Sequence, residues 1–413
     1  MKLLLLFAVV AITLCYATAN APLRFDNYQV YRITPRTSEQ IAILKTLEEN
    51  PQGYTFWSDV RMLGQPVHIM VPPHLKYNFQ DFLKLQKLDA HVWIENVQKS
   101  IDNEKSQVKT RNGDFDWTSY HDLDGIYAWL DSLAEKYPNT VSTIVGGKTY
   151  EGREIRGVKV SFGPGKKVAF IEGGIHAREW ISPATVTYIL NEFLTSDNAT
   201  IRAVAESRDW HFFPSINPDG YVYTQRDRMW RKTRKPYKNC YGADPNRNWD
   251  YYWMHGGASS YECSETFAGS EAFSEIETKS LSEYFNTIAK DVDVYLAFHS
   301  FSQLILIPFG HAGLEVPENN DELHRIGKAA AESLKNRYGT QYVVGNIPEA
   351  IYVASGGSAD WARGVHRHIR IAYTFELRDT GRHGFLLPPE QIIPTGEETL
   401  DAVVRILNEV NSS

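Results

Sequence analysis

From Tyr120 to the end of the chain, short apolar runs rich in β-branched and aromatic residues alternate with longer stretches of helical periodicity. The apolar runs are residues 158–160, 167–173, 211–215, 292–299 and 369–376, and the helical stretches are residues 180–194, 274–288, 321–338 and 394–410. This alternation is typical of an α/β domain whose sheet is covered on both faces. The sequence therefore predicts an α/β fold here, with a mixed, largely parallel central sheet and helices on both faces.

A smaller unit precedes this region. Its β-rich and helical segments follow one another in the order β-α-β-β-α-β, with strands at residues 28–33, 54–57, 67–71 and 91–94 and helices at residues 38–47 and 79–87. This order suits a small α+β domain of the ferredoxin-like type. The length of 413 residues leaves room for two such domains.

The first residues have the pattern of a secretory signal peptide. Lys2 precedes an apolar run over residues 3–14, too short to span a bilayer, and small residues follow as far as Ala21. We expect cleavage after Ala19, because a cut after Ala21 would place Pro22 beside the cleaved bond. A buried N-terminal helix is the alternative. No later segment has the length and apolarity of a transmembrane helix, so the sequence predicts a secreted, extracellular protein without membrane insertion.

Charge and cysteine usage narrow the class of protein further. The net charge of −7 and the pI near 6.0 argue against a nucleic-acid partner. Cys15 would leave with the signal peptide, so Cys240 and Cys263 remain as a pair in an oxidising compartment. A disulfide between them is expected, the alternative being two free buried thiols. Asn198-Ala199-Thr200 is an acceptor pattern for N-glycosylation, a short pattern that is often unused.

The composition changes between residues 98 and 111, a stretch with few apolar residues that leads into Asn112-Gly113. One interpretation is a solvated helix that runs into a linker. The other is a segment offered to a trypsin-like protease, because exposed basic residues at a domain boundary are where chains are cut. The two interpretations are compatible, and Lys109 and Arg111 are the candidate cleavage positions.

Histidine and carboxylate side chains follow two of the predicted strands. His176 and Glu179 come just after the run that ends at Gly173, and His299 ends the run 292–299. A His-x-x-Glu pair alone is a weak signal, and His299 alone reads as an ordinary histidine at a strand end. Ligands of open α/β sheets gather at the carboxyl ends of strands, however, and a catalytic zinc needs three protein ligands and one open position.

Two further groups carry possible chemistry. Glu376 ends the run 369–376, where partial shielding from water would raise its basicity to that of a general base. Taken alone, Glu376 could equally form an ion pair with Arg378. Arg231 and Arg247 lie in short basic segments, and a planar guanidinium is the best partner for a carboxylate or an oxyanion.

Seven strings occur together and in one order: GIHAREW at 174–180, NPDG at 217–220, WRKTR at 230–234, NRNW at 246–249, FHS at 298–300, IYVASGGS at 351–358 and FELRD at 375–379. With these strings, the sequence resembles the zinc metallocarboxypeptidases of the pancreatic digestive type over nearly the whole chain after the signal peptide, propeptide included. The resemblance implies a zymogen that removes single residues from the C-termini of peptides and proteins. The basic residues at 98–111 predict that the activating protease is trypsin-like.

The resemblance also assigns roles to residues. It implies one zinc ion per chain held by His176, Glu179 and His299, with Glu376 as general base and Arg231 as the group that stabilises the oxyanion. Further implied positions are the carboxylate-binding Asn246, Arg247 and Tyr352, the subsite residues Arg178, Ser300 and Phe385, the carboxylate Asp244 that orients His176, and the disulfide Cys240–Cys263.

The specificity pocket decides between two types of carboxypeptidase. Ala359 occupies the position where members specific for basic residues carry Asp, and Ile347, Gly310 and Thr374 match other pocket positions without charge. This predicts an A-like pocket for apolar or aromatic C-terminal side chains, with a B-like preference for Lys or Arg as the alternative. Asp360 matches an aspartate present in both types, and Phe301 replaces a tyrosine of the family.

Two other classes of protein remain as rivals. An inactive carboxypeptidase-like binding protein would lack a metal ligand or the general base, and a storage protein would not need this set of residues. The predicted organisation is therefore a signal peptide at 1–19, a propeptide with its activation linker at 20–111 and a catalytic domain at 112–413.

Overall fold

The computed structural model describes residues 21–105 and 115–412. The predicted signal peptide at 1–19 and the candidate cleavage positions Lys109 and Arg111 lie outside the described residues. In the part of the chain that is described, no helix has the length and apolarity needed to cross a membrane.

The N-terminal domain has the predicted β-α-β-β-α-β order. Its elements are β1 (Gln29–Thr34), α2 (Ser38–Glu49), β2 (Thr55–Phe56), β3 (Val67–Val71), α3 (Lys76–Leu85) and β4 (Asp89–Ile94). The four strands form an antiparallel sheet in the order β2-β3-β1-β4. Thr37 caps α2 by accepting the Gln40 N–H, and Leu44 and Leu47 of that helix are buried against the sheet.

The second domain is built on an eight-stranded sheet in the order β11-β10-β12-β9-β7-β8-β6-β5. Four of its pairings are parallel (β11-β10, β12-β9, β9-β7 and β7-β8) and the other three are antiparallel. The strands are β5 (Val141–Lys148), β6 (Glu154–Val160), β7 (Val168–Gly173), β8 (Asp209–Phe213), β9 (Val292–Ser300), β10 (Leu304–Ile307), β11 (Val343–Asn346) and β12 (Ile371–Leu377). The mixed, largely parallel sheet was predicted, although β5, β10 and β11 were not.

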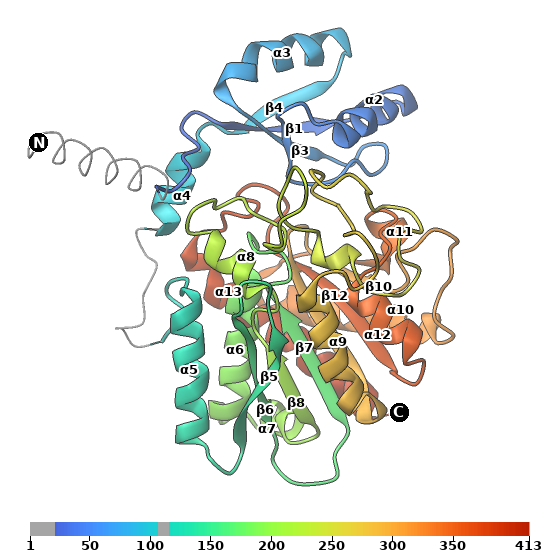
Figure 1. The fold of residues 1–413 in the computed structure, drawn as a ribbon. Helices are drawn as coiled ribbons and strands as arrows, with labels where there is room; N and C mark the ends of the chain where they lie inside the picture. Colours follow the sequence, from blue (N-terminus) through green and yellow to red (C-terminus); the bar gives the residue numbers. More distant parts are fainter. Residues whose placement is uncertain (1–20, 106–114, 413) are drawn as a thin grey trace, which may run out of the picture.

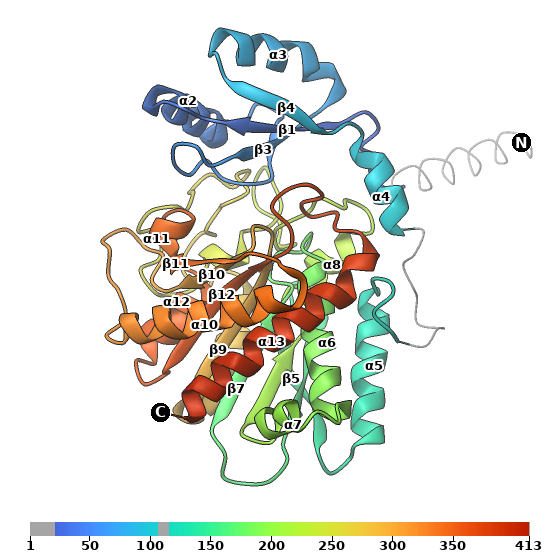
Figure 2. The same cartoon turned by 180° about the vertical axis from the view of Figure 1, so that it is seen from behind.

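Helices cover both faces of this sheet (Figures 1 and 2). One face carries α5 (Leu123–Lys136), α6 (Ile181–Thr195), α10 (Asn320–Tyr338) and α13 (Ile392–Asn411), and the other carries α9 (Ile276–Ile288) and α12 (Ser358–Val365). Shorter helices are α7 (Ala199–Ala205), α8 (Pro218–Tyr223) and α11 (Ile347–Ala350). Because helices cover both faces, every residue of β7 is buried, and Ile171 and Phe170 belong to separate hydrophobic cores.

The N-terminal domain lies over the loops at one end of the large sheet, as Figure 1 shows. Trp57 packs against Phe385 of the second domain, with ring centroids 5.5 Å apart. Arg61 Nη2 donates a hydrogen bond of 2.9 Å to Ser302 Oγ, just after β9. The same end of the sheet holds the candidate site.

Helix α4 (Val97–Lys105) forms where the sequence predicted a solvated helix, but only one of its faces is exposed. Ile101 and Glu104 are each 2% exposed, and Gln98 is also buried. The Glu104 carboxylate pairs with Arg228 of the second domain, with a distance of 2.8 Å from Nη2 to Oε1. The helix is polar in sequence because part of its buried face is an ion pair.

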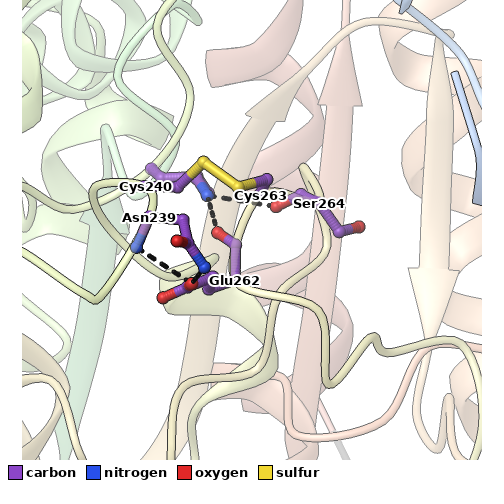
Figure 3. Close-up of a disulfide and its surroundings, with 6 residues drawn as sticks. Asn239, Cys240, Glu262, Cys263 and Ser264 are labelled. Carbon is purple, nitrogen blue, oxygen red and sulfur yellow. Dashed lines mark hydrogen bonds between the residues drawn. A yellow bond between two sulfur atoms is a disulfide. The ribbon is translucent and has the colours of Figure 1, made fainter. Parts of the chain in front are cut away.

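The predicted disulfide between Cys240 and Cys263 is present, with a Cα–Cα distance of 5.2 Å (Figure 3). Beside it, the Asn239 N–H donates to Glu262 Oε1 at 2.9 Å. This cross-link joins two parts of the long connection between α8 and α9, which also carries Arg231 and Arg247. It therefore restrains a segment that has little regular secondary structure of its own.

Candidate active site

Three strands of the large sheet end at the same place and bring the candidate residues together. His299 and Glu376 are direct neighbours across the parallel pair β9-β12, and Gly173 at the end of β7 is opposite Phe298. The turn that follows β7 carries His176 and Glu179. The carboxyl ends of β7, β9 and β12 thus supply the predicted metal ligands and the predicted base.

The three predicted metal ligands converge in the interior. His176 Nδ1 is 2.7 Å from Glu179 Oε1, His299 Nδ1 is 3.2 Å from His176 Nδ1, and His299 Nδ1 is 3.4 Å from Glu179 Oε2. The ligand atoms of the three residues all lie within 4.8 Å of one another, and all three residues are buried. Among the described residues, this is the group of histidine, cysteine and acidic side chains close enough to hold a metal.

The chemistry of these donors fits a zinc ion. Asp244 Oδ1 can only accept a hydrogen bond, so the 3.1 Å contact with His176 Nε2 requires a proton on that nitrogen and leaves Nδ1 with a lone pair. Electron pairs from two imidazoles and one carboxylate therefore face the same point. Two nitrogen ligands of a tetrahedral zinc site are about 3.3 Å apart, which agrees with the 3.2 Å between the two Nδ1 atoms.

Asp244 organises the surroundings of this cluster. Besides His176, its carboxylate accepts a hydrogen bond of 2.7 Å from Arg231 Nη2 and one of 2.8 Å from the Asn246 N–H. Burial alone would raise the pKa of Asp244, but Arg231, His176 and Arg247 hold it well below its usual range. This permanent carboxylate fixes both a metal ligand and the neighbouring guanidinium.

Glu376 lies beside His299 across the β9-β12 pair and lines a cavity next to the metal ligands. Burial raises the pKa of its carboxyl to about 8, with His299 opposing the shift and Glu179 adding to it. The alternative of an ion pair with Arg378 is wrong, because Arg378 Nε bonds to Glu398 Oε1 at 2.7 Å. Glu376 is thus a basic carboxyl placed beside the metal ligands.

A second group of side chains lies next to Glu376 and could bind an anion. Arg247 is 2% exposed, with its Nε bonded to Gly257 O at 2.8 Å and its Nη2 3.4 Å from the Tyr352 hydroxyl. Asn246 Oδ1 accepts the Ser358 N–H at 3.0 Å, so the amide NH2 group points the other way. Arg247, Asn246, Tyr352 and Glu376 all line one cavity.

The predicted specificity residues line the far part of this cavity. Ala359, Ile347 and Thr374 are on its wall with Leu306. The wall also contains Asp360, and burial raises the pKa of its carboxyl to about 7. Asp360 Oδ2 accepts the N–H of Gly310, the fourth predicted pocket residue, at 2.6 Å. One oxygen of the Asp360 carboxyl is therefore occupied by a hydrogen bond to the backbone.

The predicted subsite residues surround the metal ligands. The Ser300 N–H donates to Glu179 Oε2 at 3.2 Å. Arg178 lies over the ring of Phe385, with Cζ 4.2 Å from the centroid, and its Nη1 is 3.0 Å from Glu265 Oε2. Sequence reasoning missed Glu265, because it carries no motif and lies far from Arg178 in the chain.

Residues of the N-terminal domain also reach the site. Asp59 lines two cavities between the domains, one shared with Arg247 and Tyr352 and the other with Arg178 and Arg231. No feature of the sequence around Asp59 indicates this position, since it results from the docking of two domains.

Comparison with known proteins agrees with this geometry. The family model described as zinc carboxypeptidase matches residues 126–402, and the model described as carboxypeptidase activation peptide matches residues 31–104. Zinc carboxypeptidase A 1 of Anopheles gambiae is 48% identical over 408 residues, which cover 97% of this chain and 94% of that protein. Carboxypeptidase B of Astacus astacus is 48% identical over 303 residues, which cover 72% of this chain and 99% of that protein.

Solved structures have the same two-domain arrangement. The crystal structure of thrombin activatable fibrinolysis inhibitor superposes with a TM-score of 0.87 at 33% identity, covering 94% of this chain and all of that chain. Carboxypeptidase A from Helicoverpa armigera gives a TM-score of 0.84 at 29% identity, covering 94% and 98% of the two chains. The present chain belongs to the zinc carboxypeptidase family and is a zinc-dependent peptidase made with an activation peptide.

Proposed function

We propose that this chain is the secreted precursor of a carboxypeptidase that releases single apolar or aromatic residues from the C-termini of peptides and proteins. The observation that supports this most strongly is that the three metal ligands, a basic carboxyl and a buried guanidinium open onto neighbouring parts of one site. A carboxypeptidase needs these three elements together: a metal, a proton acceptor and a group that recognises the free chain end.

The residues around the metal have distinct roles in this proposal. A zinc ion held by His176, Glu179 and His299 supplies a Lewis acid for the scissile carbonyl and lowers the pKa of water. Glu376 takes the proton of the attacking water and passes it to the leaving amine. Arg231 stabilises the negative charge that develops on the carbonyl oxygen.

Arg247, Asn246 and Tyr352 recognise the C-terminal end of the substrate. Arg247 offers a planar guanidinium for the terminal carboxylate, and only a chain end carries a carboxylate in this position. Asn246 and Tyr352 add hydrogen bonds to the same carboxylate. This grip makes the enzyme an exopeptidase.

The pocket beyond the carboxylate selects the terminal side chain. Ala359, Ile347 and Thr374 offer no charge, so a buried Lys or Arg head group would lose its hydration without compensation. Asp360 bonds to the backbone at Gly310 and is not the counterpart of the acidic residue of basic-specific enzymes. We therefore assign an A-like preference, with Arg178, Ser300 and Phe385 lining the neighbouring subsites.

The N-terminal domain acts as a removable lid. Trp57 and Asp59 lie over the substrate-binding region, where they would collide with a bound peptide. Residues 20–111 would form the propeptide with its activation linker and residues 112–413 the catalytic domain. A trypsin-like protease that cuts after Lys109 or Arg111 would separate them, with Arg111 preferred because Asn112-Gly113 beyond it suits a protease cleft. Export through a signal peptide at 1–19 is consistent with the disulfide.

The proposal is tested first by its metal. The purified precursor, treated with trypsin, should contain one zinc per chain and should lose its peptidase activity to a chelator. Adding zinc back should restore the rate. Full activity in protein freed of metal would contradict the assignment of His176, Glu179 and His299 as the catalytic metal site.

A further inference from the structure

Glu172 is a buried carboxyl group for which the proposed reaction has no use. It lies on β7, opposite Phe213 of β8 and Ala297 of β9, and is 1% exposed. Burial raises the pKa of its carboxyl. A polar group in such surroundings costs stability unless hydrogen bonds satisfy it, so its partners indicate what it does.

Glu172 interacts with two side chains, Tyr295 of β9 and Ser358, the first residue of α12. Ser358 Oγ donates a hydrogen bond to Glu172 Oε1, and Ser358 is also 1% exposed. The backbone N–H of the same Ser358 donates to Asn246 Oδ1 at 3.0 Å. Glu172, Ser358 and Asn246 thus form a chain of hydrogen bonds from the centre of the sheet, through the start of α12, to the loop beside Arg247.

These hydrogen bonds determine which end of the Asn246 side-chain amide faces the cavity. An amide has an acceptor at one end and a donor at the other, and a substrate carboxylate can only accept. Because the Ser358 N–H requires the Asn246 oxygen, the NH2 group is the end left for the substrate. The Asn246 backbone is held as well, since its N–H donates to Asp244 Oδ1 at 2.8 Å.

We propose that Glu172 is a positioning residue for the carboxylate-binding site: it holds Ser358, and Ser358 orients Asn246 toward the substrate. Glu172 itself touches no substrate. The inference rests on the proposed role of Asn246 and adds to it the residues that make this role possible.

The test is a double-mutant cycle. It measures KM and kcat of the trypsin-activated enzyme on a peptide that ends in a free carboxylate. Ser358→Ala and Glu172→Leu should each raise KM on the order of tenfold, the size of a hydrogen bond to a charged group, while kcat stays within about twofold. Glu172→Gln keeps an acceptor for Ser358 Oγ and should retain a KM close to that of the unmodified enzyme. Zinc content should be unchanged in all of these variants.

The double variants separate positioning from general damage to the fold. If Glu172 acts through Asn246, Ser358→Ala in an Asn246→Ala background should raise KM no further. Ser282→Ala on α9 is the matched control, because it removes another buried serine hydroxyl away from the site and should leave KM unchanged. If Glu172→Leu does not fold, Ser358→Ala alone tests the proposal.

The outcomes also distinguish this inference from the proposed function. Additive effects of Ser358→Ala and Asn246→Ala, or a normal KM in Ser358→Ala, would overturn the role of Glu172 and leave the carboxylate-binding role of Asn246 standing. A normal KM in Asn246→Ala itself would overturn both.

Discussion

Glu376 and Glu277 are both carboxyls whose pKa is raised by burial, to about 8 and about 7, but only Glu376 faces the cavity beside the metal ligands. Glu376→Gln removes the proposed proton acceptor and keeps the size of the side chain. We expect kcat to fall by about 10² to 10⁴, with zinc content unchanged because Glu376 is not a ligand. Metal analysis and steady-state rates on the activated enzyme check this.

Glu277→Gln is the matched control, since Glu277 is a buried carboxyl of α9 that is not among the residues lining the cavity. It should retain the normal kcat. A Glu376→Gln enzyme with a near-normal rate would remove Glu376 from the mechanism.

Ala359 carries the prediction about specificity. The unmodified enzyme should prefer peptides ending in Phe, Tyr, Leu or Ile over those ending in Lys, because Ala359 is uncharged and the Asp360 carboxyl accepts the backbone N–H of Gly310. Ala359→Asp should move kcat/KM toward Lys and Arg, whereas Ala359→Ser should not. The assay compares kcat/KM for a peptide series that differs only in the last residue. An unmodified enzyme that already favours Lys would contradict the A-like pocket and would direct attention to Glu349, an exposed residue of α11.

At the scale of elements, α2 gives the propeptide a pH dependence. Glu48 accepts the Val60 N–H at 3.0 Å, and burial, followed by the charge of Asp59, raises its pKa from 4.5 to about 9. The folded propeptide therefore favours the protonated form. Its stability should fall as the pH rises from about 4.5 to about 9, because the unfolded chain ionises first.

Thermal unfolding of the intact precursor at several pH values measures this slope. Glu48→Gln cannot ionise, so the stability of its propeptide should fall less steeply over the same pH interval and should be higher than that of the unmodified protein near pH 8. Glu39→Gln, at an exposed position of the same helix, should keep the original slope. Identical slopes in the Glu48→Gln and unmodified proteins would rule out Glu48 as the titrating group.

Helix α4 holds the propeptide to the catalytic domain through Glu104 and Arg228. Removing one partner of a buried pair costs about 3–5 kcal/mol, because the other charge is left without compensation. Glu104→Ala should therefore release α4, speed amide hydrogen exchange over residues 97–105 and hasten tryptic activation. Asp102→Ala on the same helix removes a carboxylate that is 56% exposed and should change exchange little. Unchanged exchange in Glu104→Ala would mean that the helix is held by Ile101 and its apolar neighbours alone.

The strands of the large sheet that were predicted from the sequence are those with a clear apolar pattern along the chain. β7, β9 and β12 are buried on both faces and read as continuous apolar runs, and they place His176, His299 and Glu376 at one edge. β10 and β11 have only four residues each, too few for a recognisable pattern. The buried face of α4 was not predicted because its polar residues are satisfied by Arg228, which lies in the other domain. The identity of the site came from several strings taken together, since each alone is a weak signal.

At the scale of the whole molecule, the arrangement of the two domains explains how the precursor would be kept inactive. Trp57, Asp59 and Arg61 of the N-terminal domain lie at the face of the second domain that carries the site. We expect them to exclude a peptide from it. Brief treatment with trypsin should raise the rate on peptides sharply and leave one stable fragment of catalytic-domain size. Mass analysis of the fragment identifies the cut, which we expect after Arg111. If the intact precursor is already as fast as the trimmed enzyme on these peptides, the propeptide is a folding aid or a docking module and not a lid.

The central claim is that zinc chemistry is coupled here to recognition of a free chain end. The most direct test gives the activated enzyme two peptides of the same sequence, one with a free C-terminal carboxylate and one with a C-terminal amide. Mass spectrometry follows the products of each. The acid should lose single residues in sequence from its end, and the amide should react far more slowly because Arg247 and Asn246 have no charge to hold. Arg247→Ala should lose much of this preference for the acid. Equal rates on acid and amide, or cleavage at internal bonds, would contradict the account.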